Sequence, residues 1–218
     1  MLDWLVDLHL RFKMFPETLF TVAMIIDKYL MKKQVSKENL QLLGATAFFI
    51  AAKYEETYSV PEIKELVHLS ANAFTKSDLL RLEADILLTL DFNLIMNNTL
   101  KFMEPFVKLI KMAPKNVHLT QYILELSLLD MNFLKYKPSL LAGAGIYLVN
   151  KIRRVEEIWP DVLVGLTGYE EKDIKSCAKE LCLMFENIDK MSNTKSLRRK
   201  FSLPKFNEVA KIRLERRT

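Results

Sequence analysis

The chain has 218 residues, of which 50% are hydrophobic and 27% charged, a balance that suits one large globular domain or two small ones. With only 5 Gly and 7 Pro, and no apolar run of the roughly 18 residues that a membrane span needs, the composition excludes a disordered or membrane-spanning chain, so we expect a soluble, intracellular protein. The formal net charge of +5 arises largely from nine Lys or Arg residues between Lys195 and Arg217, and the rest of the chain is nearly balanced.

The first predicted helix covers residues 1–14 and is apolar on two sides. One stripe faces the core, and the second contains Met1, Trp4 and Leu8. An exposed Trp beside a Met indicates a candidate docking surface. The alternative is that Trp4 simply belongs to the core.

The second predicted helix runs from Pro16 to Met31, and the Pro-Glu pair at its start is typical of a first helical turn. Asp27 falls in the middle of its apolar pattern. A carboxylate at such a position loses hydration, so we expect Asp27 to have a partner.

The stretch from Leu40 to Glu56 is apolar on every side for nearly three turns and contains small residues at intervals of three, four and seven. A helix of this kind must be surrounded by protein, so we predict that it is the centre of a helical domain. It ends abruptly in Lys53, Tyr54 and two glutamates. These charges indicate either a solvated helix end or a functional surface.

A short helical segment, residues 61–69, precedes a long helix that starts within residues 74–78 and ends at Leu90. Two carboxylates, Glu83 and Asp85, lie close to the apolar face of this long helix. Five helices are thus predicted within about 95 residues.

The second half of the chain repeats the plan of the first. Residues 42–50 align without gaps on residues 140–148, at an offset of 98. The same order of elements recurs at residues 98–111, 116–129, 138–151, 160–167 and 170–187. The sequence therefore predicts an all-α fold of two tandem five-helix repeats, residues 1–95 and 96–190, followed by a basic tail, residues 191–218, that wraps loosely over the surface. Pro105 is expected to kink or split the first helix of the second repeat.

The residue types needed for catalysis or metal binding are not arranged in any recognised pattern. There is no Gly-rich phosphate loop, and the three histidines, His9, His68 and His118, lie in unrelated contexts. Cys177 and Cys182 are five residues apart on one predicted helix, which argues against a disulfide or a metal clip and predicts two buried thiols. We expect no catalytic site, no metal and no cofactor.

The repeats, the central helix that ends in Lys-aromatic-Glu-Glu and the long helix with Glu83 resemble the cyclin family over essentially the whole chain, and the details look most like mitotic A/B-type cyclins, with the B type favoured. The stretches that carry the resemblance are PETL (16–19), LQLLG (40–44), AKYEE (52–56), FTK (74–76) and LKYKPS (134–139). The resemblance implies two cyclin boxes and a non-catalytic regulatory subunit of a cyclin-dependent protein kinase. It also implies a role at the G2/M transition and a nuclear and cytoplasmic location.

In this family a Lys at the end of the central helix and a Glu on the fifth helix grip a mobile helix of the kinase, and these match Lys53 and Glu83. The resemblance implies further kinase contacts at Tyr54, Glu56, Leu87 and Phe92. It also implies a hydrophobic patch for Arg-x-Leu peptides of substrates or inhibitors, formed by Met1, Trp4, Leu40 and Gln41. Asp7 stands where a longer Glu often serves the basic residue of the peptide.

The alternative function is that of a nucleic-acid-associated transcription factor, because basal transcription factor B uses the same two-repeat fold and this chain ends in a basic tail. The nine basic residues are confined to that tail, and Lys53 with Glu83 has no role in such a protein. Nucleic acid is therefore the less favoured partner.

Overall fold

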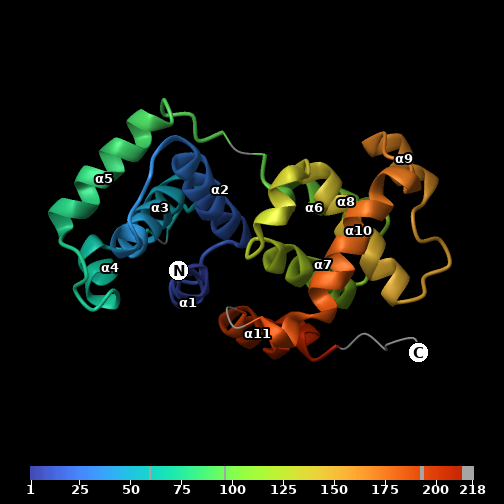
Figure 1. Ribbon diagram of the computed structural model, residues 1–218. Helices are drawn as coiled ribbons and strands as arrows, with labels where there is room; N and C mark the ends of the chain where they lie inside the picture. Colours follow the sequence, from blue (N-terminus) through green and yellow to red (C-terminus); the bar gives the residue numbers. More distant parts are fainter. Residues whose placement is uncertain (59, 96, 192–193, 213–218) are drawn as a thin grey trace. The chain divides into compact units, whose positions relative to one another are not determined.

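The computed structural model describes residues 1–58, 60–95, 97–191 and 194–212, and in these ranges the chain forms α-helices and short 3-10 helices but no strand. The helices form two compact units, Met1–Met96 and Asn97–Thr218 (Figure 1). The prediction of an all-α fold is confirmed.

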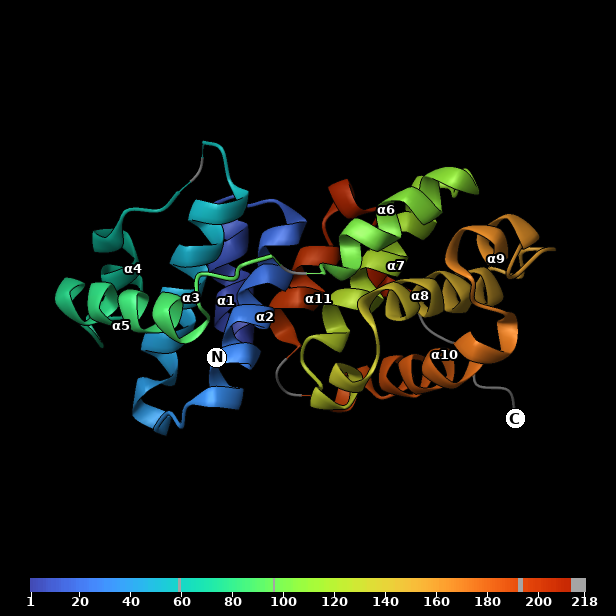
Figure 2. The same ribbon diagram turned by 90° about the horizontal axis from the view of Figure 1, so that it is seen from above.

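The first unit contains five α-helices, which form a bundle built around α3 (Figures 1 and 2). Its elements are α1 (Leu2–Arg11), α2 (Pro16–Lys32), the 3-10 turn η1 (Lys37–Asn39), α3 (Leu40–Glu55), α4 (Ile63–Leu69) and α5 (Lys76–Thr89). Helix α3 packs against α1, α2 and α5, and α4 packs against α5. The predicted central helix is thus the element against which α1, α2 and α5 all pack.

Helix α3 is central because of its side chains. All residues from Leu43 to Ala52 are buried. Small residues let neighbouring helices approach: a Cβ placed on Gly44 would meet the side chain of Met1 at 3.2 Å. Phe48, which is fully buried, fills the space between the helices.

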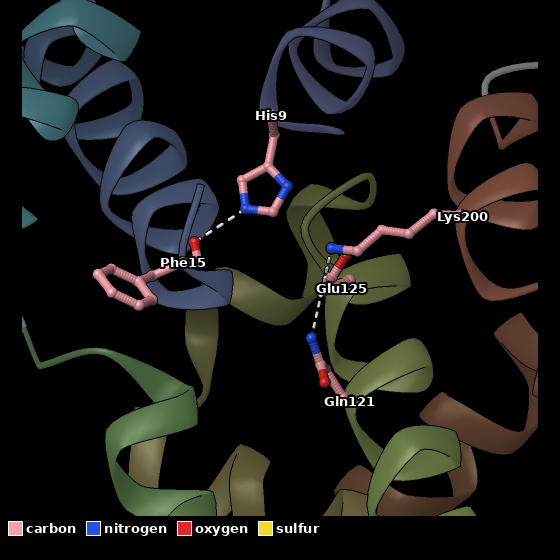
Figure 3. A network of polar contacts seen from close by, with 5 residues as sticks. All are labelled: His9, Phe15, Gln121, Glu125 and Lys200. Carbon is pink, nitrogen blue, oxygen red and sulfur yellow. Dashed lines mark hydrogen bonds and ion pairs between the residues drawn. The ribbon is translucent and has the colours of Figure 1, made fainter. Parts of the chain in front are cut away.

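Helix α1 ends at Arg11, three residues earlier than its apolar pattern predicts. The reason is local: Lys13 adopts a left-handed backbone with φ 53°, and Pro16 then begins α2. The buried ring of His9 donates from Nε2 to the carbonyl oxygen of Phe15 at 2.8 Å, which fixes this turn (Figure 3). Hydrogen bonds from a buried side chain to a loop carbonyl satisfy backbone groups that no helix pairs.

The second unit repeats the bundle. Its elements are α6 (Thr99–Leu109), α7 (Pro114–Ser127), the 3-10 helix η2 (Met131–Lys135), α8 (Pro138–Ile152), α9 (Asp161–Thr167) and α10 (Glu171–Glu186). Helix α8 packs against α6, α7 and α10, as α3 does against its neighbours. The predicted repeat is confirmed. Helix α6 continues through Pro105 without a break, so the predicted split does not occur.

The segment after Met191 packs more closely than the expected loose tail. Its described part contains α11 (Lys195–Phe201) and the 3-10 turns η4 (Pro204–Phe206) and η5 (Val209–Lys211). Leu197, Phe201 and Val209 are all buried. The expectation of a loose tail is therefore wrong for residues 194–212, because these apolar side chains anchor the segment to the second unit. The basic residues from Arg213 onward lie outside the described residues.

Both cysteines are free thiols. Cys177 is buried as predicted, and burial raises its pKa to about 12, whereas Cys182 is only half-buried. Within the described ranges, no helix has both the length and the apolar character that crossing a bilayer requires.

Candidate functional site

The structure brings Lys53 and Glu83 together. Lys53 lies in the last turn of α3 and Glu83 in the middle of α5, and the Lys53 ammonium forms an ion pair with Oε1 of Glu83. The Lys53 side chain is 44% exposed, but that of Glu83 is only 11% exposed. The lysine is therefore accessible to solvent or to a binding partner, whereas the carboxylate lies mostly beneath the lysine side chain.

The surroundings of this ion pair are apolar. Glu83 lies on the face of α5 that buries Leu79 and Ile86, and the Lys53 ammonium lies 4.4 Å from the ring centre of Phe49. A carboxylate taken out of water needs a cation to offset its lost hydration, and Lys53 supplies that cation. The ring face adds a favourable contact with the positive charge.

The other carboxylate of α5 has a different role. Asp85 accepts a hydrogen bond from the Tyr29 hydroxyl at 2.5 Å and from the Lys33 ammonium at 2.7 Å. These bonds lower the pKa of Asp85, and the pKa of Tyr29 rises to about 12 through burial and its bond to Asp85. Asp85 thus ties α5 to the end of α2 and leaves Glu83 as the carboxylate paired with Lys53.

Three of the other predicted kinase contacts present apolar surface. Tyr54 and Phe92 are exposed, Phe92 at 66%, and Leu87 is half-buried. Phe92 takes a left-handed backbone with φ 54°, just beyond the end of α5. Two further exposed leucines of α5, Leu80 and Leu88, were missed by the sequence analysis. The sequence does contain a signal for them, because leucine occurs in adjacent pairs at 79–80 and 87–88. In each pair one leucine can face the core while its neighbour lies on the outer face of the helix.

Glu56 is occupied within the first unit. Its Oε1 accepts hydrogen bonds from the backbone N–H of Phe15 at 2.7 Å and from the Thr18 hydroxyl at 2.5 Å. It therefore ties the end of α3 to the start of α2 and satisfies the backbone N–H of Phe15, the residue that precedes that helix. Any contact of Glu56 with another chain would have to share this carboxylate.

The predicted docking residues lie on α1 and at the start of α3. Met1 is exposed, and its side chain rests on Gly44 of α3, with Sδ 3.3 Å from the position of an added Cβ. Trp4 is half-buried and packs in part against the core of the first unit. The remaining members of the predicted patch, Asp7, Leu40 and Gln41, are each half-buried. Gly44 thus connects the two helices that carry the patch.

Asp27 does not have the partner that its position suggests. Among the described residues, no hydrogen bond or ion pair reaches its half-buried carboxyl group. Burial raises the pKa of Asp27 instead. Burial disfavours the charged form of a carboxyl group, so Asp27 binds its proton more tightly than a solvated aspartate does.

Comparison with known proteins identifies the family. The cyclin N-terminal domain matches residues 1–95, and the cyclin C-terminal domain matches residues 98–214. The chain belongs to the cyclin family. Cyclins are non-catalytic regulatory subunits, which agrees with the prediction that this cyclin is not an enzyme.

The similar proteins include mitotic cyclins of both types. This cyclin is 36% identical to a G2/mitotic-specific cyclin-B of Dictyostelium discoideum over 97% of its own chain and 48% of that protein. It is 35% identical to a G2/mitotic-specific cyclin-A of Drosophila melanogaster over 96% of its chain and 42% of that protein. The predicted similarity to mitotic A/B-type cyclins is confirmed. The chain spans about half the length of the curated relatives it matches.

A solved structure supports the fold. The viral cyclin from herpesvirus saimiri superposes with a TM-score of 0.69 at 22% identity, over 84% of this cyclin and 83% of that chain. At this level of identity the likeness extends to the fold alone.

Proposed function

We propose that this cyclin binds and activates a cyclin-dependent protein kinase and helps to recruit its substrates, and that it acts at the G2/M transition. The kinase-binding face contains Lys53, Glu83 and the apolar residues beside them. Membership of the cyclin family and the mitotic relatives support this function. A regulator of a mitotic kinase is expected in the nucleus and the cytoplasm.

The observation that carries the proposal is that the second unit has no counterpart of the Lys53–Glu83 pair. At the offset of 98 that relates the two central helices, Lys53 corresponds to Lys151 at the end of α8. At the offset of 95 that relates residues 78–79 to 173–174, Glu83 corresponds to Ala178, which is buried in α10. The second unit therefore builds the same bundle without the carboxylate. A charge pair that occupies this position in only one of two similar bundles is better explained by binding than by folding.

The pair and its surroundings fit the docking of a helix. Lys53 can donate to backbone carbonyl groups at the end of a docked helix while keeping Glu83 as its counter-ion. Tyr54, Leu88 and Phe92 offer exposed apolar surface on the same two elements or directly after them. A few charged groups within an apolar interface set its register and exclude wrong partners.

Activation follows if this cyclin binds the active form of the kinase more tightly than the inactive form. A change from almost fully inactive to almost fully active requires a differential affinity of about 5.5 kcal/mol. An interface of standard size, about 800 Å² on each partner, is large enough to supply this difference. This cyclin thus acts on the conformational equilibrium of the kinase and takes no part in phosphoryl transfer.

Recruitment of substrates is assigned to the patch on α1 and α3. Met1 is exposed beside Gly44, and Trp4 is only half-buried. This surface fits the leucine of an Arg-x-Leu peptide, and Asp7 offers a carboxylate for its arginine.

The experiment that tests the proposal combines the purified cyclin with a mitotic cyclin-dependent kinase and measures both binding and histone phosphorylation. We expect the double variant K53A/E83A to lose binding and activation. The matched control is Lys151→Ala, which removes the corresponding lysine of the second unit and should leave both unchanged. Full activation by the double variant, with circular dichroism showing intact folding, would refute the assigned face.

The nucleic-acid alternative gains no support from the described part of the basic tail. The Lys200 side chain is buried against Glu125, and Arg198 pairs with Asp189 at 2.9 Å. Two of the basic side chains that could bind phosphate groups of a nucleic acid are therefore already paired with carboxylates of the same chain. Salt-dependent binding of DNA by the isolated cyclin would favour the alternative.

A further inference from the structure

Residues 194–212 form a separate layer on the second unit that the proposed function does not use. Helix α11 and the turn η5 both pack against α7. Leu197, Phe201 and Val209 are each at most 1% exposed, so the segment is as closely packed as the bundle beneath it. Such burial stabilises the closed position of the segment.

A lysine and a glutamate are buried together at the centre of this layer. The Lys200 side chain is 1% exposed and that of Glu125, on α7, is 0% exposed. The Lys200 ammonium donates to both carboxylate oxygens of Glu125 at 2.7 Å, and the amide of Gln121 donates to Oε1 at 2.9 Å (Figure 3). The two charges are therefore paired entirely within the protein.

Aromatic rings lie beside the lysine of this ion pair. The ring centre of Phe201 lies 4.9 Å from those of Tyr122 and Phe206. The Lys200 ammonium lies 5.2 Å from the ring centre of Phe201 and 5.7 Å from that of Phe206. These rings keep water away from the charges, so a charge that lost its partner here would remain poorly solvated.

A second polar contact holds the far end of the segment. The amide nitrogen of Asn207 donates to Nδ1 of His118 on α7 at 2.8 Å, and the His118 ring packs edge-on against Phe206 with ring centres 5.6 Å apart. The segment is thus attached to one helix, α7, at two points.

We propose that residues 194–212 are a clasp that closes over α7 and is latched by Lys200 on Glu125. The latch makes opening all-or-none. If the ammonium leaves the carboxylate while the rings stay in place, two buried charges are left unpaired, and such an intermediate is strongly disfavoured. The clasp is therefore either fully closed or fully away from α7.

Closure also controls access to the chain. The segment is rich in cleavage sites for trypsin-like proteases, among them Lys195, Arg199 and Lys205. A protease needs an extended substrate, whereas Lys195 and Arg199 lie in helix α11 and Lys205 lies in the 3-10 turn η4 while the clasp is closed. The rate of cleavage at these sites therefore measures how often the clasp opens.

The test uses the full chain and the variant Lys200→Met, whose apolar side chain is one atom shorter than that of lysine and leaves Glu125 without its cation. We expect the midpoint of thermal unfolding of the second unit to fall by roughly 10 °C. Trypsin cleavage after Arg199 and Lys205 should be at least about 100-fold faster, and cleavage within the first unit should be unchanged. The matched control is Lys195→Ala on the exposed side of α11, which should change the midpoint by less than about 2 °C.

The double variant K200M/E125L distinguishes the latch from general loss of packing. It replaces the ion pair by apolar side chains, and replacing both members of a buried pair is often neutral. We expect slow cleavage and a midpoint close to that of the wild type. The proposal is overturned if Lys200→Met behaves as the wild type, or if the double variant opens as readily as the single one.

Discussion

The two members of the Lys53–Glu83 pair should respond differently to removal. The Lys53 side chain is 44% exposed, so without Glu83 it can recover hydration. The Glu83 side chain is 11% exposed, so without Lys53 it remains a largely buried carboxylate. We therefore expect Glu83→Leu to change the free energy of unfolding by less than about 1 kcal/mol. Lys53→Leu should lower the free energy of unfolding by about 1–3 kcal/mol.

Both substitutions should weaken binding of the kinase, whatever they do to stability. Removing one member of a desolvated charge pair at an interface costs about 2–5 kcal/mol of binding free energy, or roughly 30-fold to several thousand-fold in Kd. Glu83→Leu would then separate the two properties: a cyclin that unfolds like the wild type but no longer binds well. Urea unfolding followed by circular dichroism gives the first quantity, and isothermal titration with a cyclin-dependent kinase gives the second.

The difference in exposure between the two side chains underlies both expectations, and two outcomes would contradict them. If Glu83→Leu lowers the free energy of unfolding more than Lys53→Leu does, the carboxylate is stabilised by other groups of the fold and not by Lys53. If either variant binds the kinase with unchanged affinity, the pair is not part of the interface. Lys151→Leu is the matched control and should alter neither quantity.

Three further outcomes follow from other contacts. Glu56→Ala removes the two hydrogen bonds that hold the start of α2 to the end of α3 and should lower the free energy of unfolding by about 1–2 kcal/mol in urea titrations; an unchanged value would show that water replaces these bonds. Gly44→Ala places a Cβ 3.2 Å from Met1 and should weaken binding of a fluorescent Arg-x-Leu peptide, whereas Gly165→Ala, with no atom within 4 Å, should not. Burial lowers the pKa of His118, so its contribution to stability is complete above the unfolded value near 6.5 and is lost as the pH falls through the lowered pKa. Thermal midpoints at pH 7.5 and 5.5 should therefore differ more for the wild type than for His118→Gln, and equal differences would contradict this assignment.

The fold was predictable from the sequence because its signals are local or repeated. The all-apolar stretch of α3 has few alternatives to a buried helix, and the offset of 98 residues gives the second bundle from the first. The capping box at Thr75 and Asp78 fixes the start of α5 where the sequence places it. The early end of α1 was missed, because the left-handed backbone at Lys13 has no sequence signature in a lysine.

The contacts that were missed at the site join residues that are distant in the sequence. Glu56 appears in the sequence as one of several charges after α3, and only the fold brings it to Phe15, 41 residues away. The packed tail was missed for a related reason. A run of basic residues is typical of a solvated segment, and nothing near Lys200 in the sequence shows that Glu125 lies opposite it. The apolar spacing of Leu197 and Phe201, at i and i+4, was the available signal.

The two units each contain a lysine paired with a buried carboxylate, and the difference in exposure between the lysines suggests different uses. Lys53 is half open to solvent, so a docked chain can reach its ammonium while Glu83 stays in place. Lys200 is enclosed, so nothing can reach it until the segment that carries it leaves α7. An ion pair with a solvent-exposed lysine can replace bound water by a partner at little cost in free energy, which is what a binding site requires. A closed pair can be broken only together with the packing around it, and this suits a latch.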